Sequence, residues 1–159
     1  ISNKNIIDLA SVINGSQVVA CSDEHFGNAN NILLPGKSKN MGNGWETRRR
    51  RGRGYDWILL KLGLSGYPIS FEINTHYFKG NYPDFFSVQA INHKKNISIN
   101  SIIKNSKKWQ TIIANTKLKP DSSFKIKILK KFYKKYNYIK LNIYPDGGIS
   151  RFRIYGKIK

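Results

Sequence analysis

The sequence predicts an all-β fold, a β-sandwich or jelly roll, on three observations. Apolar and polar residues alternate in several stretches, which is typical of strands with one buried face. Turn-forming residues separate these stretches at short intervals, and segments with a helical period are scarce. The chain has 159 residues, 40% of them hydrophobic, which is enough for one core. We therefore predict a single domain over residues 1–159.

In chain order, residues 6–12 are predicted to form one or two helical turns. Strands are then expected at residues 17–21, 56–62, 69–75, 85–91, 124–130, 138–144 and 149–155. Turns are expected at residues 63–66, 80–84 and 145–148, the last as a hairpin between the final two strands. Residues 92–108 are predicted to be a polar surface loop with a strand inside it, and residues 101–113 fit helix or strand.

The last two strands show the alternation most clearly. Ile139, Leu141 and Ile143 share one face, and the positions between them are lysine and asparagine. Phe152 and Ile154 likewise point inward, with arginines at the positions on either side of Phe152. We expect these five apolar residues to be buried and the polar positions to face outward.

The net charge of +19, from 28 basic and 9 acidic residues, is typical of proteins that bind nucleic acids. However, only seven of the basic residues are arginine, and richness in Ile, Lys and Asn is typical of an AT-rich genome. We therefore do not expect nucleic-acid binding. Cys21 is the only cysteine, which excludes an intrachain disulfide and a cysteine-based zinc cluster and favours a cytoplasmic protein. No apolar run approaches the about 20 residues of a membrane span, so we expect no membrane partner.

Two segments are unusual for a generic sandwich. Residues 40–51 read Asn-Met-Gly-Asn-Gly-Trp-Glu-Thr followed by four arginines, with Asp56-Trp57 after them. Residues 141–156 read Leu-Asn-Ile-Tyr-Pro-Asp-Gly-Gly-Ile-Ser-Arg-Phe-Arg-Ile-Tyr-Gly. Both resemble signature segments of allantoicases, and residues 20–26, 33–36 and 76–84 match in the same order. The match is poorest between about residues 92 and 136.

The resemblance implies a jelly roll like that of galactose-binding and discoidin domains. It also implies hydrolysis of allantoate to ureidoglycolate and urea. Allantoicases usually carry two such repeats, and this chain resembles the second one. We therefore expect it to form a homo-oligomer that imitates the pair of repeats.

Releasing urea from allantoate requires an acid or base beside the breaking carbon–nitrogen bond and a cation for the carboxylate. Glu46, next to Trp45 and the arginine run, is the first acid or base candidate; alternatively it only balances the arginine charges. Arg48 and Arg50 share one face of an extended chain and are the candidates for carboxylate binding. The alternatives for the arginine run are a solvated basic loop or a phosphate-binding patch.

Asp23 and His25 also share a face of an extended chain, and His76 offers another titratable group, so all three are further catalytic candidates. Two ligands from one segment are too few for zinc, so we expect no cofactor, with a divalent metal as the alternative. Trp45, Asn81 and Asp146 complete the expected substrate site, although core packing and turn formation also account for them.

Three functions thus stay open on the sequence. The first is an allantoicase-type hydrolase acting on the small molecule allantoate. The second is a jelly-roll binding module that kept the fold and lost the activity. The third is a basic nucleic-acid-binding domain.

Overall fold

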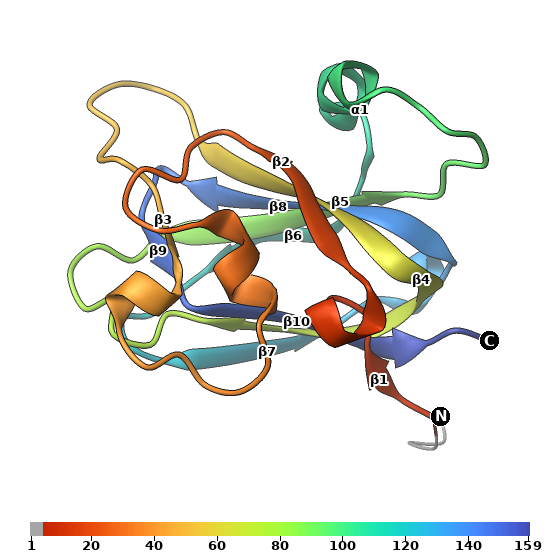
Figure 1. Ribbon diagram of the computed structural model, residues 1–159, viewed down its shortest axis with the longest axis horizontal. Helices are drawn as coiled ribbons and strands as arrows, with labels where there is room; N and C mark the ends of the chain where they lie inside the picture. The colour runs from red at the N-terminus through yellow and green to blue at the C-terminus, as the bar shows by residue number, and fades with distance from the viewer. Residues whose placement is uncertain (1–4) are drawn as a thin grey trace.

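The computed structural model describes residues 5–159 and arranges them as two packed β-sheets that share one strand (Figure 1). The shared strand is β4, Asp56–Asn74. Its first half pairs with β2, Gln17–Cys21, and with β8, Tyr136–Tyr144. Its second half pairs with β10, Arg151–Lys157, and with β7, Ser123–Lys127. All of these pairings are antiparallel.

Shorter strands complete the two sheets. Beyond β8, the first sheet continues through β5, Phe85–Ile91, to β6, Gln110–Lys117. Beyond β10, the second sheet ends with β1, Ile7–Asp8. A separate small ladder joins β3, Trp45–Glu46, to β9, Gly148–Ile149. This architecture confirms the predicted all-β jelly-roll sandwich.

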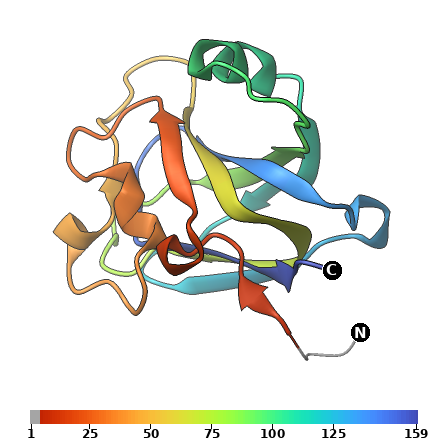
Figure 2. The same ribbon diagram turned by 45° about the vertical axis from the view of Figure 1, so that its right-hand side comes forward.

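The helical elements are short. The α-helix α1, Ile99–Ser106, begins after Ser98, whose side chain accepts a hydrogen bond from the Ser101 backbone N–H. It lies over the outer face of the first sheet (Figure 2). Within residues 5–159, no helix is long and apolar enough to cross a bilayer. The 3-10 helices are η1 Val12–Asn14, η2 Ala29–Leu33, η3 Met41–Asn43 and η4 Lys130–Phe132.

The core lies between the two sheets. All five apolar residues predicted from the last two strands are fully buried there. Burying one such side chain stabilises the fold by about 1.5–3 kcal/mol. A second, smaller cluster, with Leu59, Trp109 and Tyr138, packs Ile102 of α1 onto the outside of the first sheet.

Three local predictions were wrong. Residues 63–66 do not turn the chain but lie within β4, where the register of its pairing with β8 shifts. A side chain at Gly63 would collide with the Asn14 backbone, so this glycine permits a close approach. Residues 145–148 do not close a hairpin, because β4 lies between β8 and β10. Residues 92–108 contain α1 rather than a strand.

The N-terminal prediction also needs correction. Residues 6–12 were predicted to be helical, but β1 lies there and only η1 follows. The Asp8 carboxylate accepts hydrogen bonds from the backbone N–H groups of Ala10 and Ile154, at 3.0 and 2.9 Å. These bonds tie the segment to β10, so tertiary pairing outweighed the local pattern.

The prediction for Lys140 on β8 was also wrong. It was predicted to face outward, but it is 1% exposed. Its Nζ lies 5.6 and 5.5 Å from the ring centroids of Tyr55 and Trp57, and 3.5 Å from the Tyr55 hydroxyl. No carboxylate in the described part of the chain pairs with it. Burial, and secondarily the charge of Lys107, lowers the pKa of Lys140 to about 8.

This lowered pKa predicts a pH-dependent stability. Between pH 8 and the unfolded lysine pKa of about 10.4, the unfolded chain binds more protons, so stability rises with pH in that window. Lys140→Met removes the buried cation and should raise the free energy of unfolding at pH 7 by about 1–3 kcal/mol. Urea unfolding should show this advantage shrinking as the pH rises from 8 towards 10.

The matched control is Lys61→Met, at an exposed position of the neighbouring strand, which should leave the pH dependence unchanged. A Lys140→Met protein that is less stable than the wild type at pH 7 would contradict the prediction. It would mean that the aromatic contacts of the ammonium outweigh its desolvation.

Candidate functional site

Four loops meet at one end of the sandwich, around the small ladder of β3 and β9 (Figure 1). On one side of β3, Gly27 forms an isolated bridge with Glu46. On the other side, Thr47 and Gly147 form two hydrogen bonds. The Thr47 N–H donates to the Gly147 carbonyl, and the Gly147 N–H donates to the Thr47 hydroxyl, both at 3.1 Å. The Gly148 N–H donates to the Asn81 carbonyl at 2.8 Å. The segment that follows Trp45 is therefore held from both sides.

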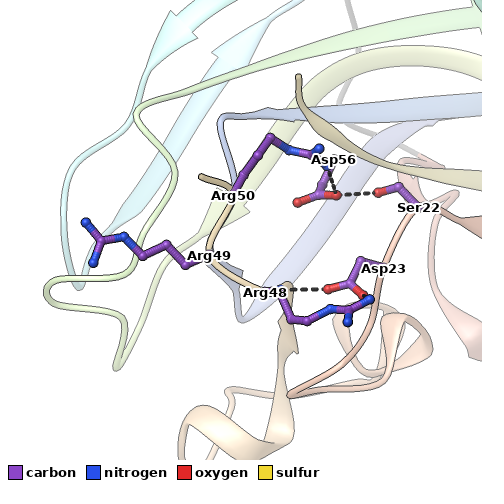
Figure 3. Close-up of a pocket in the computed structure, with 6 residues that line it drawn as sticks. All are labelled: Ser22, Asp23, Arg48, Arg49, Arg50 and Asp56. Atoms are coloured by element: carbon purple, nitrogen blue, oxygen red, sulfur yellow. Dashed lines mark hydrogen bonds and ion pairs between the residues drawn. The ribbon is translucent and has the colours of Figure 1, made fainter. Parts of the chain in front are cut away.

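This segment forms one wall of a pocket of about 200 Å³. The pocket is lined by Ser22, Asp23, Arg48, Arg49, Arg50 and Asp56 (Figure 3). Ligand pockets for drug-sized molecules occupy about 300–1,000 Å³. The pocket therefore suits a small polar ligand, and its three guanidinium and two carboxylate groups leave it with a net positive charge.

Asp56 and Arg50 form the buried side of the pocket. The Arg50 Nη2 lies 2.9 Å from Asp56 Oδ1, and the Ser22 hydroxyl donates to the same oxygen at 2.8 Å. The Asp56 side chain is 2% exposed, so its charge is compensated by these partners rather than by solvent. Arg50 also donates to the Tyr55 carbonyl at 3.1 Å. The guanidinium of Arg50 is thus already engaged within the protein.

Asp23 and Arg48 form the exposed side. The Asp23 carboxylate accepts from the Arg48 backbone N–H at 2.6 Å and lies 3.3 Å from the Arg48 Nη2. The Arg48 side chain is 68% exposed, so its other N–H groups are free for a ligand. Trp45 donates from Nε1 to the Asp23 carbonyl at 2.7 Å, which fixes the loop that carries this carboxylate.

Figure 3 shows the alternation predicted for the arginine run. The side chains of Arg48 and Arg50 turn towards the two carboxylates, whereas Arg49 points away from them. The backbone N–H of Arg50 donates to Asp146 Oδ2 at 2.7 Å, so the loop after β8 positions this segment. Asp146 therefore has a structural partner in the free protein.

Glu46 lies just outside the pocket lining, on the same segment. It is partly buried, and its Oε2 accepts a hydrogen bond from the Asn81 amide at 2.6 Å. Asn81 is in turn bonded through its carbonyl to β9. The structure thus brings together six sequence-predicted residues in three bonded pairs: Glu46 with Asn81, Arg48 with Asp23, and Arg50 with Asp146.

The other three candidates are placed differently. Trp45 is fully buried and supports the pocket wall without reaching a ligand. His25 is exposed, with its ring edge-on to Phe26 at a centroid distance of 4.6 Å. His76 is partly exposed after β4, and the next residue, Tyr77, donates its N–H to Asp121. No interaction within residues 5–159 links either histidine to the pocket. In the same range, no group of three or more His, Cys, Asp or Glu side chains could hold a metal ion.

The sequence interpretation missed Ser22, Asp56 and Arg49 as pocket residues. Asp56 lay in the Asp-Trp pair that follows the arginine run, and Ser22 in the short match at residues 20–26, so both signals were present. Neither could be placed, because their contact joins residues 34 positions apart.

Arg151 anchors the underside of the site. It was predicted to point outward but is 2% exposed. It donates to the carbonyls of Gly36, Asn31 and Asn43 at 2.9, 3.0 and 2.7 Å. Its Nη2 also donates to the Asn43 side chain at 2.6 Å. Through these bonds β10 holds the long loop that leads into Trp45.

Known proteins with a similar sequence and structure are allantoicases. A sequence profile of the allantoicase repeat matches residues 7–159. A probable allantoicase from Acinetobacter baumannii is 42% identical over 158 residues, which are 98% of this chain but 46% of that protein. The crystal structure of allantoicase from Saccharomyces cerevisiae superposes with a TM-score of 0.82 at 34% identity, covering 98% of this chain and 45% of that one.

A fucolectin from striped bass serum shares only the fold, with a TM-score of 0.67 at 13% identity over 95% of this chain. The likeness is consistent with a jelly roll of the discoidin and lectin type. The chain spans a little under half the length of the curated relatives that it matches.

The buried arginine generates a prediction about the loop beneath the site. Arg151→Met keeps the bulk but removes the guanidinium that donates to the Gly36, Asn31 and Asn43 carbonyls. Gly36 keeps its bond from Arg153 and Asn31 its bond from the Leu34 N–H, so the loss falls mainly on Asn43. The free energy of unfolding should fall by about 2–4 kcal/mol. Urea denaturation measures the loss, and hydrogen exchange should show reduced protection in residues 29–44. Arg53→Ala, at an exposed position, is the control. A loss below about 1 kcal/mol would show that water replaces the guanidinium.

Proposed function

The chain belongs to the allantoicase repeat family, and we propose that it contributes the substrate site for hydrolysis of allantoate to ureidoglycolate and urea. The observation that carries the proposal is the pocket itself. An exposed arginine beside an aspartate, with a glutamate on the same segment that is bonded to Asn81 of the loop after β4, matches what a small anion with two ureido arms requires. These groups lie in a frame 42% identical to probable allantoicases.

Arg48 is the proposed receptor for the substrate carboxylate. Among residues 5–159 its guanidinium has one ion pair, with Asp23, and its planar fork can donate two hydrogen bonds to a carboxylate. Arg50 is less available, because Asp56 and the Tyr55 carbonyl occupy its Nη2. Asp23, held in place by the Arg48 N–H, can accept a hydrogen bond from a ureido N–H group.

Glu46 is the proposed proton-transfer group. Hydrolysis adds the oxygen of water to the central carbon, and the departing ureido nitrogen leaves with a proton as urea. A carboxylate can take a proton from water and return it to the leaving nitrogen. The Asn81 amide nitrogen donates to Glu46 and orients this carboxylate. The side-chain oxygen of Asn81 can accept a hydrogen bond from a ureido N–H group.

An inactive binding module is the second candidate. The residues matched here are 46% of relatives named as enzymes, so the remaining part of those relatives can supply groups that these residues lack. A site completed by another repeat would then bind a ligand here without turning it over. Urea release separates the two candidates, because only the hydrolase produces urea.

The purified chain incubated with allantoate is therefore expected to release urea. Glu46→Gln should lower kcat by about 10²–10⁴-fold, with a much smaller change in KM, because the amide cannot take up a proton. Arg48→Lys keeps the charge but loses the fork, so it should mainly raise KM. Steady-state kinetics of urea formation measures both effects.

Glu72→Gln is the matched control, because Glu72 lies on β4 in the second sheet and pairs with Lys125. Its kinetics should equal those of the wild type. Near-normal turnover by Glu46→Gln would make Glu46 structural and move the proton-transfer role to Asp23, which Asp23→Asn then tests. Binding of allantoate without urea release would favour the binding module.

We also predict that the chain self-associates, through a two-fold interface that imitates a pair of repeats. Relatives are about twice as long as the matched region, so one copy supplies half of their architecture. Light scattering coupled to size exclusion should show a dimer or larger species. A strict monomer at high concentration with full activity would contradict this prediction.

A further inference from the structure

A second hollow lies beside the pocket and shares part of its wall. It has a volume of about 590 Å³ and is lined by Arg49, Arg50, Arg51, Gly52, Arg53 and Pro145. Arg49 and Arg50 line both spaces. Arg49, which points away from the carboxylates of the pocket (Figure 3), is not used by the proposed reaction.

The charge of this hollow is not balanced. Arg49, Arg51 and Arg53 are exposed, and in the described part of the chain none of them forms an ion pair. The nearby carboxylates are engaged: Asp56 pairs with Arg50, and Asp146 accepts from the Arg50 backbone N–H. Three guanidinium groups within five residues therefore repel one another with no anion between them.

The loop is held in the shape that gathers these charges. Arg50 reaches across it to the Tyr55 carbonyl, so the chain from residue 51 to residue 54 curls around the Arg50 side chain. Gly54 has a φ of +133° and lies so close that an added Cβ would stand 3.0 Å from Arg50 Nη1. Pro145, from the loop after β8, also lines the hollow. The guanidinium groups thus surround one space instead of following a line.

We propose that this hollow binds a small multivalent oxyanion of the diphosphate class. Arginine forks match phosphate oxygens in two hydrogen bonds, and several unpaired forks around one space suit a ligand with several charged oxygens. The single carboxylate of the proposed substrate needs one fork, which Arg48 supplies in the neighbouring pocket. The inference is therefore independent of the proposed reaction and is tested without measuring activity.

The test is calorimetric titration of the whole chain with inorganic pyrophosphate at low ionic strength. Arg51→Ser combined with Arg53→Ser removes two exposed guanidinium groups and lowers the net charge from +19 by two. The control is Lys94→Ser combined with Lys95→Ser, at exposed positions before α1, which lowers the net charge equally. The arginine variant should weaken binding by about tenfold or more, whereas the lysine variant should stay within about twofold of the wild type.

Two further measurements are needed. One tests whether binding depends on the guanidinium forks or only on positive charge, and the other tests whether the ligand is a free diphosphate or part of a nucleotide. Arg51→Lys combined with Arg53→Lys keeps the charge and loses the forks, so it should also weaken pyrophosphate binding. Adenosine diphosphate that binds more tightly than pyrophosphate would identify a nucleotide as the source, and weaker binding would identify the free diphosphate.

Three results would overturn the proposal. The first is an absence of pyrophosphate binding by the wild type, and the second is an equal loss in the arginine and lysine variants. The third is tighter binding of duplex DNA than of pyrophosphate that persists at physiological salt, since non-specific contacts with DNA phosphates weaken steeply as salt rises. Equal loss would show that only the overall charge attracts anions.

Discussion

Strand β4 pairs on both edges in both sheets, and this sharing sets where the rest of the chain can lie. Its first half pairs with β2 and β8, and its second half with β10 and β7. The ends of β2 and β8 lie beside the start of β4, where Cys21 is opposite Ile58 and Ile143 is opposite Asp56. Asp56, the first residue of β4, therefore meets Ser22 from the loop after β2 and Arg50 from the loop before β4. The register of one strand thus assembles the buried side of the pocket.

Buried charge is the second constraint, and the three buried ions Asp56, Arg151 and Lys140 have different kinds of partner. Asp56 pairs with Arg50 and accepts a hydrogen bond from Ser22, which offset part of the cost of burying its charge. Arg151 pairs with no carboxylate within residues 5–159 but donates to several loop carbonyls, which holds the loop that leads into Trp45. The Lys140 ammonium lies over two aromatic rings and makes one long contact to a hydroxyl, and burial lowers its pKa to about 8. The first two ions support the site directly, and the third lies behind it on the outer face of the sheet.

The positive charge of the arginine segment is divided between two spaces. On one side, two carboxylates reduce the charge of Arg48 and Arg50, which leaves a small pocket suited to a singly charged polar molecule. On the other side, Arg49, Arg51 and Arg53 face a larger space without acidic partners. Arg48 and Arg49 point in different directions (Figure 3), the chain from residue 51 to residue 54 curls around Arg50, and Arg49 and Arg50 line both spaces. One stretch of chain can therefore present two different electrostatic environments.

The sequence by itself determined the fold class, the core positions and the family. Alternation is a local property, so Ile139, Leu141, Ile143, Phe152 and Ile154 could be assigned to the interior without knowing what covers them. The resemblance of residues 40–51 to allantoicase segments pointed to the stretch after Trp45 as a candidate site, and a pocket lies beside it. The sequence could not show that Lys140 and Arg151 are buried, because their outer faces are covered by residues distant in the chain. Nor could it show that β4 separates β8 from β10, or that Asp56 and Ser22 line the pocket. These features depend on strand order and on contacts between distant residues, which only the tertiary structure decides.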